Sequence, residues 1–167
     1  PELKEAMHQA VVSSQLVPMY PGTSLRNKGV QPLLDASIEY LPNPLERPAV
    51  TGVNPKTNLA ENREQSVDAP FSGLAFKVQL DPHVGKLYYV RIYSGTLKSG
   101  SYILNATKGV QERVGRLLLM HANNREDIPE AFAGEIVAVV GLKETHTGHT
   151  LCDLVDPIGL EGITFGV

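Results

Sequence analysis

The chain has 167 residues, of which 42% are hydrophobic and 20% are charged. This length can bury a core, and the composition excludes an intrinsically disordered protein. The net charge of −3 argues against bulk nucleic-acid binding. The single Cys152 excludes an internal disulfide and a multi-cysteine zinc site, and it favours a reducing compartment. No membrane span and no signal peptide are predicted, and the first residue, Pro1, suggests a fragment of a longer protein.

The first 41 residues are expected to form a helix, a strand and a second helix. Apolar residues at helical spacing predict helices over residues 2–14 and 30–41, and Pro42 ends the second. The short apolar run at residues 16–20 is closed by Pro-Gly and predicts a strand. A lone strand cannot pair its backbone groups, so we expect its partner sheet to lie upstream, in an α/β domain.

Residues 42–72 are rich in Pro, Asn, Thr and Glu, and they are expected to be a linker with one irregular strand near 49–53. From Gly73 onward apolar residues alternate, with glycine at the turns. The expected strands are residues 74–80, 87–93, 102–105, 113–121, 135–142, 150–153 and 163–165. This pattern predicts a mainly β fold, a closed β-barrel or a sandwich. We favour the barrel because closure removes exposed strand edges.

The charge is unevenly distributed along the barrel segment. Residues 77–116 carry seven basic and two acidic side chains, whereas residues 117–167 carry two basic and eight acidic ones. A basic segment can contact a phosphate backbone even in an acidic protein, because salt screens each charge within about 8 Å. The alternative is that these are ordinary solvated residues. Four tyrosines interleave with the basic residues and are suited either to base stacking or to packing within the sheet, namely Tyr88, Tyr89, Tyr93 and Tyr102.

No catalytic motif is present in the sequence, and no catalytic or metal-ligating residue is predicted. His146 and His149 are three residues apart, but further zinc ligands are missing and the stretch is typical of a glycine turn. Cys152 lies in an apolar run and is expected to be inert. Residues 124–130 are expected to form an acidic loop that is solvated or faces other protein surfaces.

Several short motifs resemble one family. Residues 27–35 (NKGVQPLLD) and 40–42 (YLP) resemble the end of the GTPase domain of bacterial translation elongation factor G. The second domain of that factor is resembled by DPHVGKL at 81–87, YSGTLKSG at 93–100, RVGRL at 113–117, MHAN at 120–123 and VGLK at 140–143. The resemblance spans nearly the whole chain.

The resemblance implies a remnant of a G domain at 1–41, a linker at 42–72 and an elongation factor Tu-like barrel at 73–167. The family hydrolyses GTP, with magnesium, while it promotes translocation of tRNA and mRNA on the ribosome in the cytoplasm. Its phosphate loop, switch segments and NKxD motif would lie upstream of residue 1. The loop Thr23, Ser24 and Leu25 would then face guanine, and only in the full-length protein.

The resemblance also implies a barrel that contacts small-subunit ribosomal RNA and packs against the remainder of the G domain. The residues expected to face RNA are Lys98, Lys108, Arg113 and Arg116, in a monomeric fragment without catalytic activity of its own. The alternatives are a ribosome-protection or release-factor GTPase of the same architecture, or a stand-alone barrel that binds small ligands or peptides. A stand-alone hydrolase would need a nucleophile–base pair that the sequence lacks.

Overall fold

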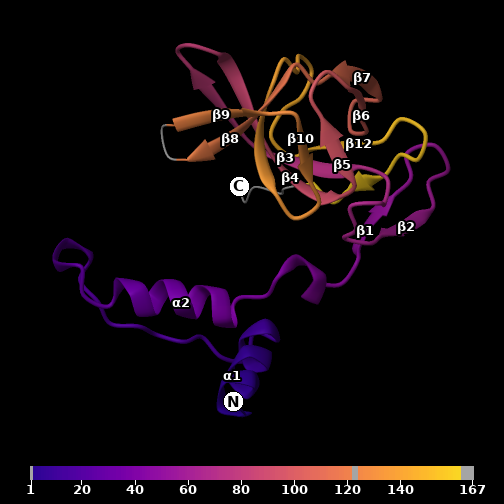
Figure 1. Cartoon of the computed structure of the whole chain (residues 1–167). Coiled ribbons are helices and arrows are strands. Elements are labelled where there is room, and N and C mark those ends of the chain that lie inside the picture. Colours follow the sequence, from indigo (N-terminus) through magenta and orange to yellow (C-terminus); the bar gives the residue numbers. More distant parts are fainter. Residues whose placement is uncertain (1, 122–123, 163–167) are drawn as a thin grey trace, which may run out of the picture. The chain divides into compact units, whose positions relative to one another are not determined.

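The structure is a computed structural model that describes residues 2–121 and 124–162. It divides into two compact units, Pro1–Pro48 and Ala49–Val167, which are described separately (Figure 1). The fold is mainly β, with two α-helices, both in the first unit. Among the described residues, neither helix combines the length and the apolar character needed to cross a membrane.

The first unit contains the two predicted helices. They are α1 (Glu2–Val12) and α2 (Val30–Tyr40), with short 3₁₀ helices at Ser24–Arg26 and Pro44–Glu46. His8 of α1 joins these elements, because its Nδ1 lies 3.0 Å from the carbonyl oxygen of Glu39 and its Nε2 lies 2.8 Å from Oε1 of Glu46. The hydrogen bond that the His8 ring donates to the Glu46 carboxylate raises the pKa of His8.

No strand forms at residues 16–20, where the sequence predicts one. The segment is irregular, and it has no ladder partner within the described part of the chain. The exposure of its side chains still alternates, because Val17 and Met19 are 83% and 91% exposed while Leu16 and Tyr20 are 39% and 38% exposed. The short apolar run predicted a strand here, but a strand also needs a neighbour with which to exchange hydrogen bonds.

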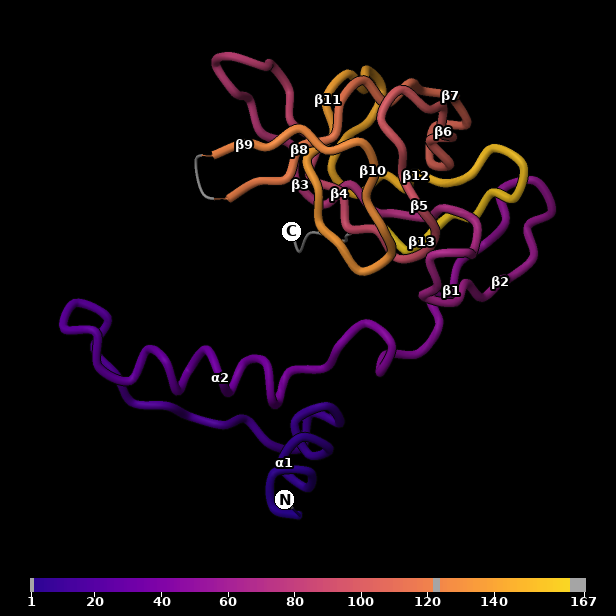
Figure 2. Tube along the Cα trace, viewed as in Figure 1, coloured from indigo at the N-terminus to yellow at the C-terminus, as the bar shows by residue number. Residues whose placement is uncertain are grey.

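The second unit is an antiparallel β-barrel, as predicted. Its eight-stranded sheet has the order β7-β6-β12-β3-β4-β11-β8-β9, and the pair β10-β5 completes the wall (Figures 1 and 2). The strands of these two sheets are β3 (Ser72–Asp81), β4 (Gly85–Ser94), β5 (Thr96–Lys98), β6 (Tyr102–Asn105), β7 (Val110–Arg113), β8 (Arg116–His121), β9 (Asn124–Ile128), β10 (Glu130–Phe132), β11 (Ile136–Val140) and β12 (His149–Cys152).

The second unit has a small buried cluster of Leu87, Leu118 and Ala138 and a larger hydrophobic core that fills the barrel. Inward-facing residues of most strands contribute to it, among them Tyr88, Val90, Ile92, Leu117, Val137, Val139 and Leu151. These residues are at most 1% exposed, which places nearly all of their apolar area out of water. Burying each such side chain is worth about 1.5–3 kcal/mol, so this core stabilises the barrel.

The segment predicted as a linker is partly ordered within the second unit. Residues 50–53 form β1 (Val50–Val53), which pairs with β2 (Ala60–Arg63) and with β13 (Gly159–Leu160). Arg63 is 5% exposed, and its guanidinium lies 3.0 Å and 3.3 Å from the two carboxylate oxygens of Asp156. The partners of this hairpin lie about a hundred residues away, and therefore local composition gives no sign of the pairing.

Two further expectations differ from the structure. The run expected as one strand over 113–121 is divided into β7 and β8 at Gly115, whose N–H donates to the carbonyl of Val140 at 2.9 Å. The expected acidic loop at 124–130 contains β9, which pairs with β8 in a hairpin. The predicted strand at 163–165 lies outside the described residues.

Candidate functional sites

The four basic residues expected to face RNA all lie on the wall formed by β5 to β8. Lys98 ends β5, Lys108 lies in the β6–β7 turn, Arg113 ends β7 and Arg116 begins β8. All four are exposed. The Oγ of Ser99, next to Lys98, donates to the carbonyl of Gly115 at 3.1 Å. This bond brings Lys98 close to the β7–β8 junction that holds both arginines, while Lys108 lies at the opposite end of the β6–β7 hairpin.

These four residues differ in their acidic neighbours. The Nζ of Lys98 lies 3.8 Å from Glu130, and an Nη of Arg116 lies 3.7 Å from Asp127. Both pairs are exposed, and such pairs stabilise a fold by about 1 kcal/mol or less. For Lys108 and Arg113, no carboxylate lies within ion-pair distance in the described residues. These two residues therefore present uncompensated positive charge.

A buried carboxylate that sequence reasoning missed supports this wall from inside. Glu112 lies between the outward-facing Gln111 and Arg113, and it is 6% exposed. One carboxylate oxygen accepts hydrogen bonds from the backbone N–H groups of Lys143 and Glu144, at 2.5 Å and 2.9 Å. The other accepts from the Thr145 hydroxyl and, at 3.3 Å, from the Asn105 amide.

The pKa of Glu112 reflects these contacts. Burial alone would raise the pKa, but the hydrogen bonds from Thr145, from the backbone of Glu144 and Lys143, and from Asn105 outweigh burial and lower it. Glu112 is therefore ionised at neutral pH and fixes the loop after β11 against the β6–β7 hairpin. The sequence carries one signal that Glu112 is buried. Alternate residues of a strand face the same side, so residue 112 shares the inward side with Val110 and Val114.

The two histidines of the expected glycine turn belong to the same network. The Nδ1 of His149 lies 3.2 Å from the Asn105 amide nitrogen and accepts the backbone N–H of His146 at 3.2 Å. This nitrogen is therefore an acceptor in the neutral ring. Burial lowers the pKa of His149, and the nearby His146 and Lys108 lower it further. No group of three or more possible metal ligands occurs in the described ranges.

The structure separates the four tyrosines that interleave with the basic residues. Tyr88 is 1% exposed and lies in the core. Tyr89 packs against Phe76 with ring centroids 6.4 Å apart, and the Nζ of Lys77 lies 5.3 Å from its ring. Tyr93 is half-buried, whereas Tyr102 is 57% exposed. Of these four, Tyr102 alone presents a largely open ring.

The loop expected to face guanine is tightly closed on itself in the first unit. The backbone groups of Thr23 and Lys28 exchange hydrogen bonds of 2.9 Å and 3.1 Å across the turn. Gly29 has a φ of +74°, and a Cβ there would lie 2.7 Å from the carbonyl oxygen of Pro21. Only glycine fits this approach. Ser24 and Leu25 lie at the start of the 3₁₀ helix and are exposed.

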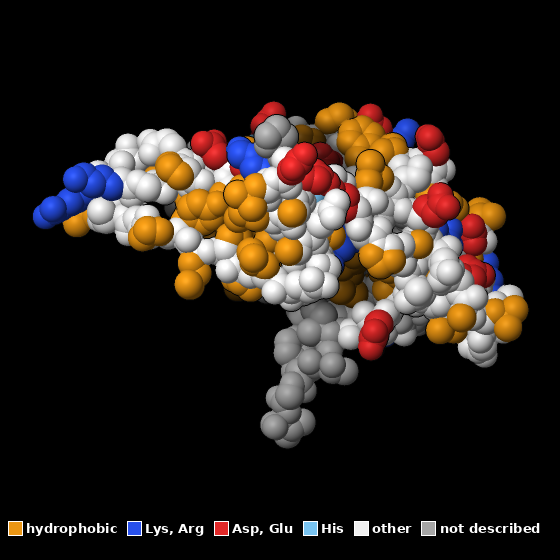
Figure 3. Space-filling model, turned by 90° about the horizontal axis from the view of Figure 1, so that it is seen from below, with side chains coloured by type: hydrophobic (Ala, Val, Ile, Leu, Met, Phe, Trp, Pro, Cys, Tyr) orange, Lys and Arg blue, Asp and Glu red, His pale blue; other side chains and the backbone are white. Residues whose placement is uncertain are grey.

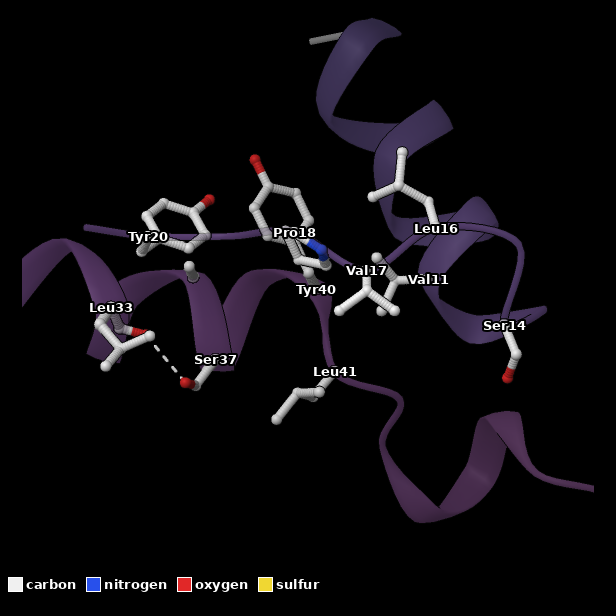
Figure 4. Close-up of a pocket in the computed structure, with 11 residues that line it drawn as sticks. Val11, Ser14, Leu16, Val17, Pro18, Tyr20, Leu33, Ser37, Tyr40 and Leu41 are labelled. Carbon is white, nitrogen blue, oxygen red and sulfur yellow. Dashed lines mark hydrogen bonds between the residues drawn. The ribbon is translucent and has the colours of Figure 1, made fainter.

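The first unit also has an apolar groove of about 340 Å³ between α1, the 16–20 segment and α2 (Figure 4). Tyr20, Leu33 and Tyr40 are among the side chains that line it. Leu33, Leu34 and Ile38 of α2 are 50%, 59% and 85% exposed. In the space-filling view, apolar side chains gather over this unit (Figure 3). Neighbouring exposed apolar side chains of this kind can mark a surface that another part of a protein covers.

The second unit thus defines the class of the protein, which is an antiparallel β-barrel module. The sequence profile of elongation factor G domain 2 matches residues 70–154, half of the chain. The chain belongs to the elongation factor G domain 2 family.

A solved structure gives a second comparison. The crystal structure of a protein from Thermus thermophilus resembles this chain with a TM-score of 0.68 and 30% sequence identity. The similarity covers 93% of this chain and 20% of that one. The chain therefore spans about a fifth of the length of that protein. Because 93% coverage extends beyond residues 70–154, the likeness includes more than the barrel.

Proposed function

We propose that this chain is the part of a bacterial elongation factor G that comprises the end of the GTPase domain and the second domain. Its role is to contact the small ribosomal subunit, as part of a GTPase that promotes translocation in the cytoplasm. The observation that carries this proposal is the family match over the barrel. The basic wall of β5 to β8 supports it, because phosphate backbones attract such surfaces.

In this proposal ribosomal RNA is contacted through Lys98, Lys108, Arg113 and Arg116, and the monomeric chain binds as one copy. Charged contacts to an RNA backbone need basic groups near phosphates and little further geometry. Lys108 and Arg113 should contribute most, because Lys98 and Arg116 are partly neutralised by Glu130 and Asp127.

We expect Lys108→Glu with Arg113→Glu to weaken binding of the chain to purified 30S subunits at least about tenfold at about 100 mM salt, because two phosphate contacts become repulsive. The matched variant is Lys98→Glu with Arg116→Glu, which should have the smaller effect. Sedimentation of the chain with 30S subunits over a salt series measures both. Equal, salt-independent binding by the wild type and both variants would contradict the proposed RNA surface.

The first unit supports the G-domain part of the proposal. The 16–20 segment has no ladder partner among residues 2–121 and 124–162, and α2 has an exposed apolar face. Both features fit an α/β domain whose sheet is supplied by another part of the protein. We infer that the remainder of the G domain covers this groove. GTP and magnesium would be held by that remainder, with Thr23, Ser24 and Leu25 facing the guanine ring.

The chain by itself is expected to show no GTP turnover and no measurable GTP binding, because the described residues offer neither a phosphate loop nor a magnesium site. Release of phosphate from GTP by the purified chain, with and without ribosomes, measures the first. Equilibrium dialysis with labelled GTP measures the second. Hydrolysis above the ribosome-only control would contradict the assignment of residues 1–41 to the end of a G domain.

A further inference from the structure

The outward face of the β6–β7 hairpin combines an open aromatic ring with unpaired positive charge. Tyr102 of β6 lies opposite Arg113 of β7, and Leu104 lies opposite Gln111. These four side chains share one face, because Ile103 and Glu112 between them point inward and are buried. β7 is the last strand of the eight-stranded order, so the hairpin lies at an edge of that sheet.

The exposure of Tyr102 has no structural explanation within the described residues. Among them, no ring contact or hydrogen bond holds its side chain, whereas Tyr89 is fixed by Phe76 and Lys77. An aromatic ring that is 57% exposed leaves apolar area in water that a partner could bury. A tyrosine required only for folding would be expected to pack against the sheet.

The charges on this face have a single sign. Between residues 99 and 115 the charged residues are Lys108, Glu112 and Arg113. The carboxylate of Glu112 is buried and satisfied by hydrogen bonds from the loop after β11. An approaching ligand therefore meets the Tyr102 ring beside the Arg113 cation, with a second cation, Lys108, at the turn end of the hairpin. An anionic partner with flat, stackable groups is complementary to this face, which describes an unpaired stretch of RNA.

We propose that Tyr102 stacks on an unpaired nucleobase of small-subunit ribosomal RNA while Arg113 contacts the phosphate next to that base and Lys108, at the turn end of the hairpin, contacts a phosphate farther along the RNA strand. This proposal rests on the proposed function and adds a base-stacking contact to it. Stacking on an aromatic residue tolerates any base, because every base has a π face. Arg113, opposite Tyr102 in the register, is placed to hold the phosphate next to the stacked base.

The test measures binding of the full chain to 30S subunits and to protein-free 16S RNA. Tyr102→Ala should weaken binding to both RNA targets at least about fivefold. The slope of log affinity against log salt concentration should not change, since the ring carries no charge. Tyr102→Phe should bind within about twofold of wild type, and Tyr102→Leu should resemble the alanine variant. Irradiation with ultraviolet light should crosslink wild-type chain to 16S RNA, and Tyr102→Ala should lose that crosslink.

Arg113→Gln should lower the salt slope by about one ion, while Lys86→Gln, on the β3–β4 hairpin, should leave it unchanged. Equal urea midpoints show that the variants are folded.

If wild type binds 30S subunits and Tyr102→Ala binds equally well, the stacking proposal is wrong and the proposed function stands. If wild type binds neither probe, the proposed function itself fails. Wild-type affinity of Tyr102→Leu would indicate an apolar protein contact and overturn RNA stacking.

Discussion

Replacing Gly95 with alanine is expected to prevent the barrel from folding stably. Gly95 joins β4 to β5 with a φ of +71°, and a Cβ there would lie 2.5 Å from the carbonyl oxygen of Ala69 and 2.6 Å from the backbone nitrogen of Phe71. Both contacts are with backbone, which cannot rotate away. The N–H of Gly95 donates to the carbonyl of Ser66 at 2.8 Å, so a shift would also break this bond.

We expect Gly95→Ala to lower the free energy of unfolding by about 3 kcal/mol or more, or to give insoluble protein. Urea unfolding followed by circular dichroism measures this loss. Gly100→Ala is the matched control, because Gly100 has a similar φ of +78° but no atom within 4 Å of an added Cβ. The control should lose only about 1 kcal/mol, from backbone strain. Equal losses would show that strain, and not the close approach to residues 69–71, makes Gly95 necessary.

Removing the carboxylate of Glu112 has the second large expected effect. Glu112→Ala leaves the backbone N–H groups of Lys143 and Glu144 and the Thr145 hydroxyl without their acceptor. Unpaired buried donors cost about 1–3 kcal/mol each, so the free energy of unfolding should fall by about 3 kcal/mol. Glu126→Ala, at an exposed position of β9, should change it by about 0.5 kcal/mol or less. Urea midpoints at neutral pH compare the two.

The same carboxylate should make stability depend on pH. Its pKa is lower in the folded state than in the unfolded chain, where a glutamate titrates near about 4.3. As pH falls, the unfolded state therefore binds the proton first. The stabilisation of the fold by ionised Glu112 is complete above the unfolded-state pKa and is lost as pH falls through the folded-state pKa. The difference in unfolding free energy between wild type and Glu112→Gln should accordingly shrink below about pH 4. A difference that stays constant down to about pH 3 would show that ionised Glu112 contributes nothing.

Several elements could be predicted because their signals are local. Helical spacing of apolar residues predicts α1 and α2, and two-residue alternation predicts β3, β4 and β6 close to their observed bounds. The strand pairing of β1 and the hairpin β8–β9 could not be predicted in this way. Residues 52–53 of β1 pair with residues 159–160, and β9 is a charged, exposed strand whose order depends on β8.

The basic residues of β5 to β8 also show which features the sequence can predict and which need the tertiary structure. The family resemblance, together with the basic segment, selected four cations, and all four are exposed on β5 to β8. It could not separate Lys108 and Arg113 from Lys98 and Arg116, because the carboxylates of Glu130 and Asp127 approach only after β10 pairs with β5 and β9 pairs with β8. Nor could it select Tyr102 among the four tyrosines, because exposure depends on which other strands cover each face.

By itself, the sequence determined the mainly β barrel, the two helices before it and the positions of its basic residues, because periodicity and charge are written in consecutive residues. The tertiary structure alone decided that residues 16–20 have no ladder partner within the described part of the chain, that Glu112 is buried among four donors, and that Tyr102 stays open beside Arg113. Each of these depends on atoms brought together from distant parts of the chain, and a hydrogen bond or a buried area exists only once both partners are in place.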